Sequence, residues 1–268
     1  MNLVEALAQA RGRIASAEAK RLLRHVLAIT ASEVAAHPER ALDESQSSRY
    51  AELVQRRAAG EPVAYLVGSR EFYGRDFRVT PAVLIPRPET ELLVELALTK
   101  VSRGGTPRML DLGAGSGCVA ITLALELGCA VTAVDVSVEA LAVARDNAVR
   151  FGARVNFIES DWFAGVEGRF ELIVGNPPYV AEGDAHLRDL AFEPMTALAC
   201  GADGLNAIRR IVADAPRHLT PGGWLLLEHG YDQAAAVAAL LAGAGFVAVE
   251  QHRDLAGIVR VSGGRMPD

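Results

Sequence analysis

The sequence predicts an α/β protein in which a small helical domain precedes a mostly parallel, seven-stranded sheet. From residue 107 onward, short apolar stretches alternate with helical patterns, which is typical of a parallel sheet with helices on both faces. The last two stretches are separated only by Arg253–Ala256, too few residues for a parallel crossover, so the last strand should be antiparallel. Before residue 60 the apolar residues recur with helical periodicity throughout.

The N-terminal part should form four helices. Apolar residues line one side of each of the first two helices, Ser32 should begin the third, and Asp43 should cap a fourth that runs to Ala59. We expect residues 1–68 to form a helical domain that docks the substrate. Residues 69–83 should form a β-hairpin linker, with its turn centred on Gly74–Asp76.

The second domain, residues 84–268, should begin with a helix over Glu89–Val101 and then form the sheet. A surface helix is expected near the alanine-rich Ala234–Ala242. The seven strands are predicted near residues 108–112, 130–135, 154–159, 170–175, 222–229, 246–252 and 257–262.

Composition excludes several classes of function. The chain has 268 residues and a net charge of −6, which argues against a protein that binds nucleic acid directly, because such binding needs many phosphate contacts. We expect no membrane span and no signal peptide, since no apolar stretch of the required length occurs. The three cysteines lack the spacing of metal ligands, so no metal site is predicted.

A glycine-rich turn follows the first predicted strand of the sheet. Gly113, Gly115 and Gly117 alternate with Ala114 and Ser116, and glycine at such a turn lets a ligand approach the backbone closely. Asp135 ends the second strand, where a carboxylate can accept both hydroxyls of a ribose. Together they indicate a nucleoside-containing cofactor, either a nicotinamide dinucleotide or S-adenosylmethionine (SAM). The alternative is a tight strand–helix turn with a capping aspartate.

The tetrapeptide Asn176-Pro-Pro-Tyr179 follows the fourth strand. The two prolines remove backbone donors, so carbonyl oxygens prevail there. The amide oxygen of Asn176 and the carbonyl oxygen of Pro177 could both accept hydrogen bonds from one planar –NH2 group, and the Tyr179 ring could stack on it. The pattern therefore predicts a receptor for an amide or exocyclic amine, with a proline-rich turn as the alternative.

The order of these motifs resembles the amino-methyltransferases of the class I fold. Further stretches are similar to the PrmC/HemK family, which methylates glutamine in peptide chain release factors. They are Glu61–Gly68, Glu71–Gly74, Leu84–Glu91, Glu193-Pro194, Ala197-Leu198 and Gly201–Leu205.

The resemblance implies a Rossmann-like methyltransferase sheet, SAM as cofactor and S-adenosylhomocysteine as product. It implies methyl transfer to the glutamine of a Gly-Gly-Gln motif in a release factor, by a cytoplasmic and monomeric enzyme. The cofactor-binding residues would be Gly113, Ala114, Gly115, Ser116, Gly117, Asp135, Trp162 and Asn176. The catalytic residues would be Asn176, Pro177 and Tyr179, and the substrate would also touch Pro178.

Some residues near these motifs receive no catalytic role. A side-chain amide reacts with SAM without prior loss of a proton, so neither His186 nor His229 is needed as a base. Arg87, Glu89 and Glu91 are explained by bracing of a loop and the start of a helix.

Two other functions stay open from the sequence. One is a nucleic-acid methyltransferase acting on exocyclic amines, which the same tetrapeptide would suit. The negative charge and the absence of a recognisable target-recognition domain argue against it. The other is a non-catalytic SAM-binding module, which would have no need of an amine receptor.

Overall fold

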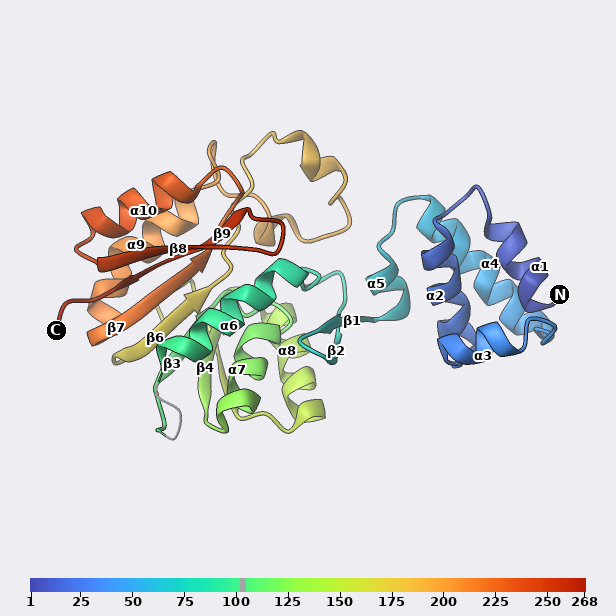
Figure 1. The fold of residues 1–268 in the computed structure, drawn as a ribbon, viewed down its shortest axis with the longest axis horizontal. Coiled ribbons are helices and arrows are strands. Elements are labelled where there is room, and N and C mark those ends of the chain that lie inside the picture. Colours follow the sequence, from blue (N-terminus) through green and yellow to red (C-terminus); the bar gives the residue numbers. More distant parts are fainter. Residues whose placement is uncertain (102–104) are drawn as a thin grey trace. The chain divides into compact units, whose positions relative to one another are not determined.

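The computed structural model describes residues 1–101 and 105–268 (Figure 1). The described chain divides into two compact units, Met1–Ser69 and Arg70–Asp268. The predicted division into docking domain, linker and catalytic domain stays a prediction. Within the described residues, every helix is too short or too polar to cross a membrane.

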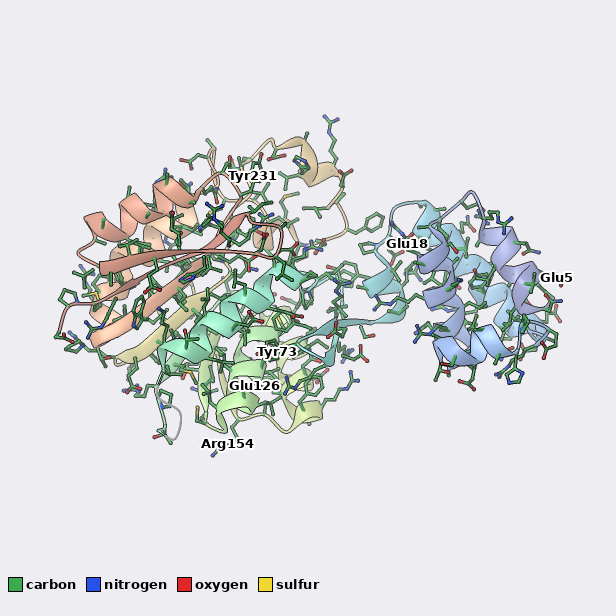
Figure 2. The ribbon with its side chains drawn as sticks, in the orientation of Figure 1. Glu5, Glu18, Tyr73, Glu126, Arg154 and Tyr231 are labelled. Atoms are coloured by element: carbon green, nitrogen blue, oxygen red, sulfur yellow. The ribbon has the colours of Figure 1, made fainter. Side chains whose placement is uncertain are left out.

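The first unit is helical and has its own core. Leu22, Leu23 and Leu53 are fully buried in it, and a 3.0 Å ion pair between Glu18 and Arg57 joins two of its helices. Figure 2 labels Glu18 and also Glu5, whose carboxylate closes the capping box at the first helix. The helices are α1 (Leu3–Ala10), α2 (Ser16–Leu27), α3 (Ala31–Ala36), α4 (Glu44–Ala58) and α5 (Val63–Val67).

The predicted start of the third helix is wrong by one residue. Thr30 caps α3, because its hydroxyl accepts the N–H of Glu33 at 3.2 Å while the Glu33 carboxylate accepts the N–H of Thr30 at 2.8 Å. Ser32 lies inside the helix. The threonine provides the reciprocal cap that a serine two residues later cannot provide from within the helix.

A two-stranded hairpin, β1 (Ser69–Phe72) and β2 (Arg75–Arg78), follows the helices. Its turn is Tyr73-Gly74, with φ of 51° and 72°, so the prediction of a turn centred on Gly74–Asp76 is wrong. A two-residue turn with positive φ at both positions matches the twist of the paired strands. Phe72 and Phe77 are buried in the core of the second unit.

The second unit is built on a seven-stranded sheet with the order β5-β4-β3-β6-β7-β9-β8. The prediction of a reversed last strand is confirmed, because β9 pairs antiparallel with both β7 and β8. The strands are β3 (Met109–Leu112), β4 (Val131–Asp135), β5 (Val155–Glu159), β6 (Phe170–Gly175), β7 (Leu219–Glu228), β8 (Val247–Arg253) and β9 (Val259–Arg265).

Helices cover both faces of this sheet (Figure 1). On one face, α6, α7 and α8 bury residues in one apolar core, and on the other α9 and α10 bury residues in a second. Tyr73 and Glu126, labelled in Figure 2, belong to the α6–α8 side, where Arg75 joins the hairpin to α7 through a 2.7 Å ion pair with Glu126. The helices are α6 (Glu91–Lys100), α7 (Cys118–Leu127), α8 (Val138–Phe151), α9 (Asn206–His218) and α10 (Ala234–Gly243).

The helix expected over Glu89–Val101 is split. A 3₁₀ turn, η1 (Pro88–Thr90), precedes α6, which ends at Lys100. Two further 3₁₀ turns, η2 (Ala185–Arg188) and η3 (Met195–Ala197), lie in the long connection between β6 and α9.

The strand order reverses beside β3. From β3 the chain runs outward through β4 to β5, and then returns to add β6 on the other side of β3. The loops after β3 and β6 therefore separate to opposite faces and leave a crevice at the carboxyl edge, where open α/β sheets bind ligands.

Candidate active site

A cavity opens at this crevice, at the carboxyl ends of β3, β4, β5 and β6. Its walls also include residues of the connection before α6 and of the turn at η3. Most of the predicted site residues line it: Gly113, Ala114, Gly115, Ser116, Asp135, Trp162, Asn176 and Pro178. Three others are not among its lining residues, but each is next to one in the chain: Gly117, Pro177 and Tyr179.

The glycine turn after β3 is tied to β4 by its backbone. The N–H groups of Gly113 and Ala114 both donate to the carbonyl oxygen of Val134, at 2.9 and 2.8 Å. Gly115 has φ of 52°, and a Cβ there would meet no atom within 4 Å. Glycine is thus needed at 115 for its backbone conformation and not for packing, and the open space above it is where a ligand can approach.

Gly117 has a different role. Its φ is 80°, and a Cβ would lie 2.8 Å from Cδ1 of Ile121 and 3.2 Å from Cβ of Ala144. It therefore lets α7 start close to α8 behind the cavity.

The Asp135 carboxylate is fixed at the edge of the cavity by two backbone donors. Its Oδ2 accepts the N–H of Gly115 at 2.8 Å, and its Oδ1 accepts the N–H of Ser137 at 2.9 Å. Each oxygen keeps lone-pair capacity for another donor. The side chain is therefore already oriented to accept two neighbouring hydroxyl groups.

The turn after β5 presents the Trp162 ring to the cavity. Trp162 has φ of 53°, held by Ser160, whose hydroxyl donates to the Trp162 carbonyl oxygen at 2.9 Å and accepts the N–H of Gly165 at 2.8 Å. A Cβ on Gly113 would lie 3.7 Å from the ring. The neighbouring Asp161 also lines the cavity and forms a 2.9 Å ion pair with Arg210.

The Asn176 amide faces the cavity from the end of β6. Its Nδ2 donates to the hydroxyl oxygen of Thr90 at 3.2 Å, while Oδ1 has no protein partner among the described residues. Thr90 comes from η1 and is only 2% exposed. The amide can therefore offer its oxygen to a ligand donor.

The rest of the tetrapeptide is anchored from behind. Pro177 is buried, and Tyr179 is half-buried against the core that includes α9. The Tyr179 hydroxyl donates to Oε1 of Glu228 at 3.4 Å, and its carbonyl oxygen accepts from the Gln233 amide at 2.9 Å. Burial raises the pKa of Tyr179, so the phenol stays neutral.

Asp111 is a cavity residue that the sequence reasoning missed. It lies within β3, is 2% exposed, and accepts the N–H of Ala120 at 3.1 Å. Burial raises the pKa of Asp111 to about 7, although the hydrogen bond from Ala120 lowers it in part. A lone carboxyl inside the apolar run Met109–Leu112 is the signal that could have revealed it.

The two histidines left without a role lie apart from this chemistry. His186 is exposed beside Asp184, with 2.8 Å between Nδ1 and Oδ1. His229 is fully buried, with its ring nitrogens 2.8 Å from the Ser262 hydroxyl and 2.9 Å from the Gly230 carbonyl oxygen.

Comparison with known proteins decides the family. The PrmC N-terminal domain matches residues 2–68, and the methyltransferase small domain matches residues 88–236. The release factor glutamine methyltransferase of Burkholderia pseudomallei is 51% identical over 261 residues, which cover 93% of this chain and 92% of that protein. That of Bordetella pertussis is 50% identical over 254 residues, 92% of this chain and 93% of the relative. The chain belongs to the release factor glutamine methyltransferase family.

Solved structures agree on the fold. A methyltransferase from Pyrococcus furiosus superimposes with a TM-score of 0.57 at 23% identity, covering 83% of this chain and all of that one. A T. thermophilus 16S rRNA methyltransferase, in complex with AdoMet and guanosine, superimposes with a TM-score of 0.55 at 22% identity. The match covers 74% of this chain and 49% of that one. The class I methyltransferase fold predicted from the sequence is confirmed.

In this family member, Arg87 has a structural partner that the sequence did not reveal. Its guanidinium lies 2.5 Å from a carboxylate oxygen of Glu193, which is 6% exposed. The other Glu193 oxygen accepts the N–H of Ile85 at 3.0 Å. The pair joins the connection before α6 to the one after β6, and residues of both segments line the cavity.

Proposed function

We propose that this chain transfers a methyl group from SAM to the side-chain amide nitrogen of the glutamine in the Gly-Gly-Gln motif of peptide chain release factors. The observation that carries the proposal is the Asn176 amide, anchored through Nδ2 on Thr90 and open at Oδ1 in the same cavity as the glycine turn and Asp135. Family membership supports the choice of glutamine, because the relatives are named for that reaction.

The residues of the cavity fit SAM. The open space over Gly115 would admit the methionine part, the free lone pairs of Asp135 would accept the ribose hydroxyls, and the face of Trp162 would pack against adenine. The Asp111 carboxyl, which is buried and lines the cavity, would face the cationic end of the cofactor. When bound, SAM supplies a methyl group already activated by a sulfonium.

The protein's main contribution is then alignment. An amide nitrogen is a weak nucleophile, because its lone pair is conjugated with the carbonyl. Holding it in line with the methyl group can supply roughly 7–11 kcal/mol in favourable cases. Asn176 Oδ1 and the Pro177 carbonyl oxygen would accept its two N–H groups. These hydrogen bonds strengthen as positive charge develops on nitrogen, which stabilises the transition state more than the ground state.

The choice of partner would involve the first unit. Residues 2–68 match the PrmC N-terminal domain, and we assign them to docking of the release factor. Tyr179 would support the amide receptor. A release factor is present where translation occurs, so we expect a cytoplasmic enzyme, acting as a monomer and without direct contact to nucleic acid.

A competition experiment tests this proposal. The full chain is incubated with labelled SAM, an intact release factor and duplex DNA, and the label in protein and in DNA is counted separately. Label in the release factor alone supports the proposal. Preferential labelling of DNA would replace it with exocyclic-amine methylation, and SAM binding without transfer to either acceptor would leave a non-catalytic module.

A further inference from the structure

Glu228 is a buried carboxyl directly behind the Asn176 amide. In the sheet, Gly175 of β6 pairs with Leu227 of β7, so the residues that follow them, Asn176 and Glu228, come side by side. Glu228 is 1% exposed, and its Oε2 has no hydrogen-bond partner among the described residues. A carboxyl in such a place is costly unless its neighbours compensate for the lost water.

Thr90 connects Glu228 to the amide. Its hydroxyl oxygen accepts from Asn176 Nδ2 at 3.2 Å, and the same hydroxyl is close enough to Glu228 that hydrogen bonding from Thr90 opposes the rise in the pKa of that carboxyl. A threonine hydroxyl has one proton to donate. While that proton points to an ionised Glu228, the oxygen can only accept from Asn176.

We infer that Glu228, acting through Thr90, fixes which way the Asn176 amide points, so that Oδ1 and not Nδ2 faces the substrate. The inference rests on the proposed function, because an amide or amine substrate brings N–H donors and needs an acceptor. A flipped Asn176 amide would present its own donors to those of the substrate. Glu228 is thus a positioning residue and touches neither substrate nor cofactor.

The protonation state of Glu228 sets the direction of this chain of hydrogen bonds. Burial raises the pKa of Glu228 to about 7. A protonated Glu228 can donate to Thr90, whose hydroxyl can then donate to Asn176 Oδ1 and hold the flipped amide. The productive orientation therefore belongs to the ionised form and is gained as pH rises through about 7.

Other charged and titratable groups face Glu228 from the surrounding elements. Glu89 in η1 raises its pKa, whereas Arg260 in β9 and the Tyr179 hydroxyl lower it. Cys118 at the start of α7 is also near enough to interact with it, but burial raises the pKa of this thiol to about 12. Burial raises the pKa values of both the Tyr179 phenol and the Cys118 thiol, so these two neighbours stay neutral around pH 7 while Glu228 titrates.

The test compares Thr90→Val, Thr90→Ser and Glu228→Gln in the full chain. We expect Thr90→Val to lower kcat about tenfold, the effect of one lost hydrogen bond of about 1.4 kcal/mol, with unchanged SAM affinity. Thr90→Ser should restore kcat, because it keeps the hydroxyl. The matched control is Thr220→Val, which lies at the end of β7 opposite to Glu228. This variant should transfer methyl groups like the parent.

The pH profile separates positioning from a structural role. Ionisation of Glu228, with a pKa of about 7, should raise the parent kcat about tenfold from about pH 6 to about pH 8. Glu228→Gln should lose this rise, while Glu250→Gln on β8 should keep it. A Glu228→Gln profile that rises like that of the parent, or a Thr90→Val enzyme with parental kcat, would overturn the inference.

An NMR measurement makes the inference independent of the acceptor. The side-chain amide signals of Asn176 should titrate with a midpoint near 7 in the parent and not in Glu228→Gln. If this titration is seen in a chain that methylates no release factor, the inference holds and the proposed function fails. If the chain is active and the signals do not change with pH, the inference alone is wrong.

Discussion

Replacing Asp135 by Asn should weaken SAM binding without unfolding the protein. The carboxylate accepts Gly115 N–H through Oδ2 and Ser137 N–H through Oδ1, at 2.8 and 2.9 Å. An asparagine keeps one acceptor oxygen and puts an NH2 group in place of the other. One backbone donor and one ribose hydroxyl would then face a donor instead of an acceptor.

The magnitude follows from these bonds. A hydrogen-bonding group left unpaired in a buried site costs about 1–3 kcal/mol, so the Kd for SAM should rise about 5- to 150-fold. Calorimetric titration measures this Kd, and circular dichroism verifies that the variant is folded. Asp146→Asn, an exposed carboxylate on α8 that pairs with Arg78, is the matched control and should bind SAM like the parent. A Kd for Asp135→Asn equal to that of the control would refute the assignment of Asp135, and NAD binding in place of SAM would refute the cofactor.

Four further predictions concern catalysis, packing, pH and docking. Asn176→Ala should abolish most of the methyl transfer measured in single-turnover experiments, while its stability to unfolding stays like that of the parent. A single-turnover rate equal to that of the parent would remove Asn176 from the mechanism. Gly117→Ala should lower the free energy of unfolding by about 1–3 kcal/mol, because its Cβ meets Ile121 at 2.8 Å; Gly128→Ala, whose Cβ would meet nothing within 4 Å, should cost less in denaturant titrations. Because the folded state raises the pKa of Glu228 from 4.5 to about 7, the ionised carboxyl destabilises the fold increasingly as pH rises through that window. The free energy of unfolding of Glu228→Gln, relative to that of the parent, should therefore increase by about 3 kcal/mol between pH 4.5 and pH 8. A difference between the two proteins that stays constant with pH in urea titrations would contradict this. Removing residues 1–69 should reduce transfer to an intact release factor far more than SAM binding, and a truncated, folded chain that transfers at the full rate would disprove the docking role.

The sheet could be predicted because its signals are local. Alternating strand and helix patterns gave the seven strands, and the short connection after Arg253 gave the reversed β9. Errors arose where neighbouring residues compete for one role. Thr30 and Ser32 are both good caps, and only Thr30 has Glu33 three residues later. In the hairpin, Tyr73 adopts a positive φ that its residue type does not suggest.

Much of the cavity wall could also be predicted, since the glycine turn, Asp135 and Asn176 end strands that the sequence identifies. What the sequence could not give is how distant segments meet. Thr90 lies 86 residues before Asn176, and the Ile85–Glu193 contact spans 108 residues. Asp111 and Glu228 were missed because each lies in an apolar strand whose pattern predicts core, and burial of a carboxyl is visible only in three dimensions.

The central claim is that the methyl group is bound to a glutamine amide nitrogen. The direct measurement is the chemical form of the label in the modified release factor. After transfer from methyl-labelled SAM, the Gly-Gly-Gln peptide is isolated and hydrolysed in acid. Our account predicts that the label is released as methylamine from that peptide. Label that stays on another residue, or that is released as methanol from an ester, would contradict it.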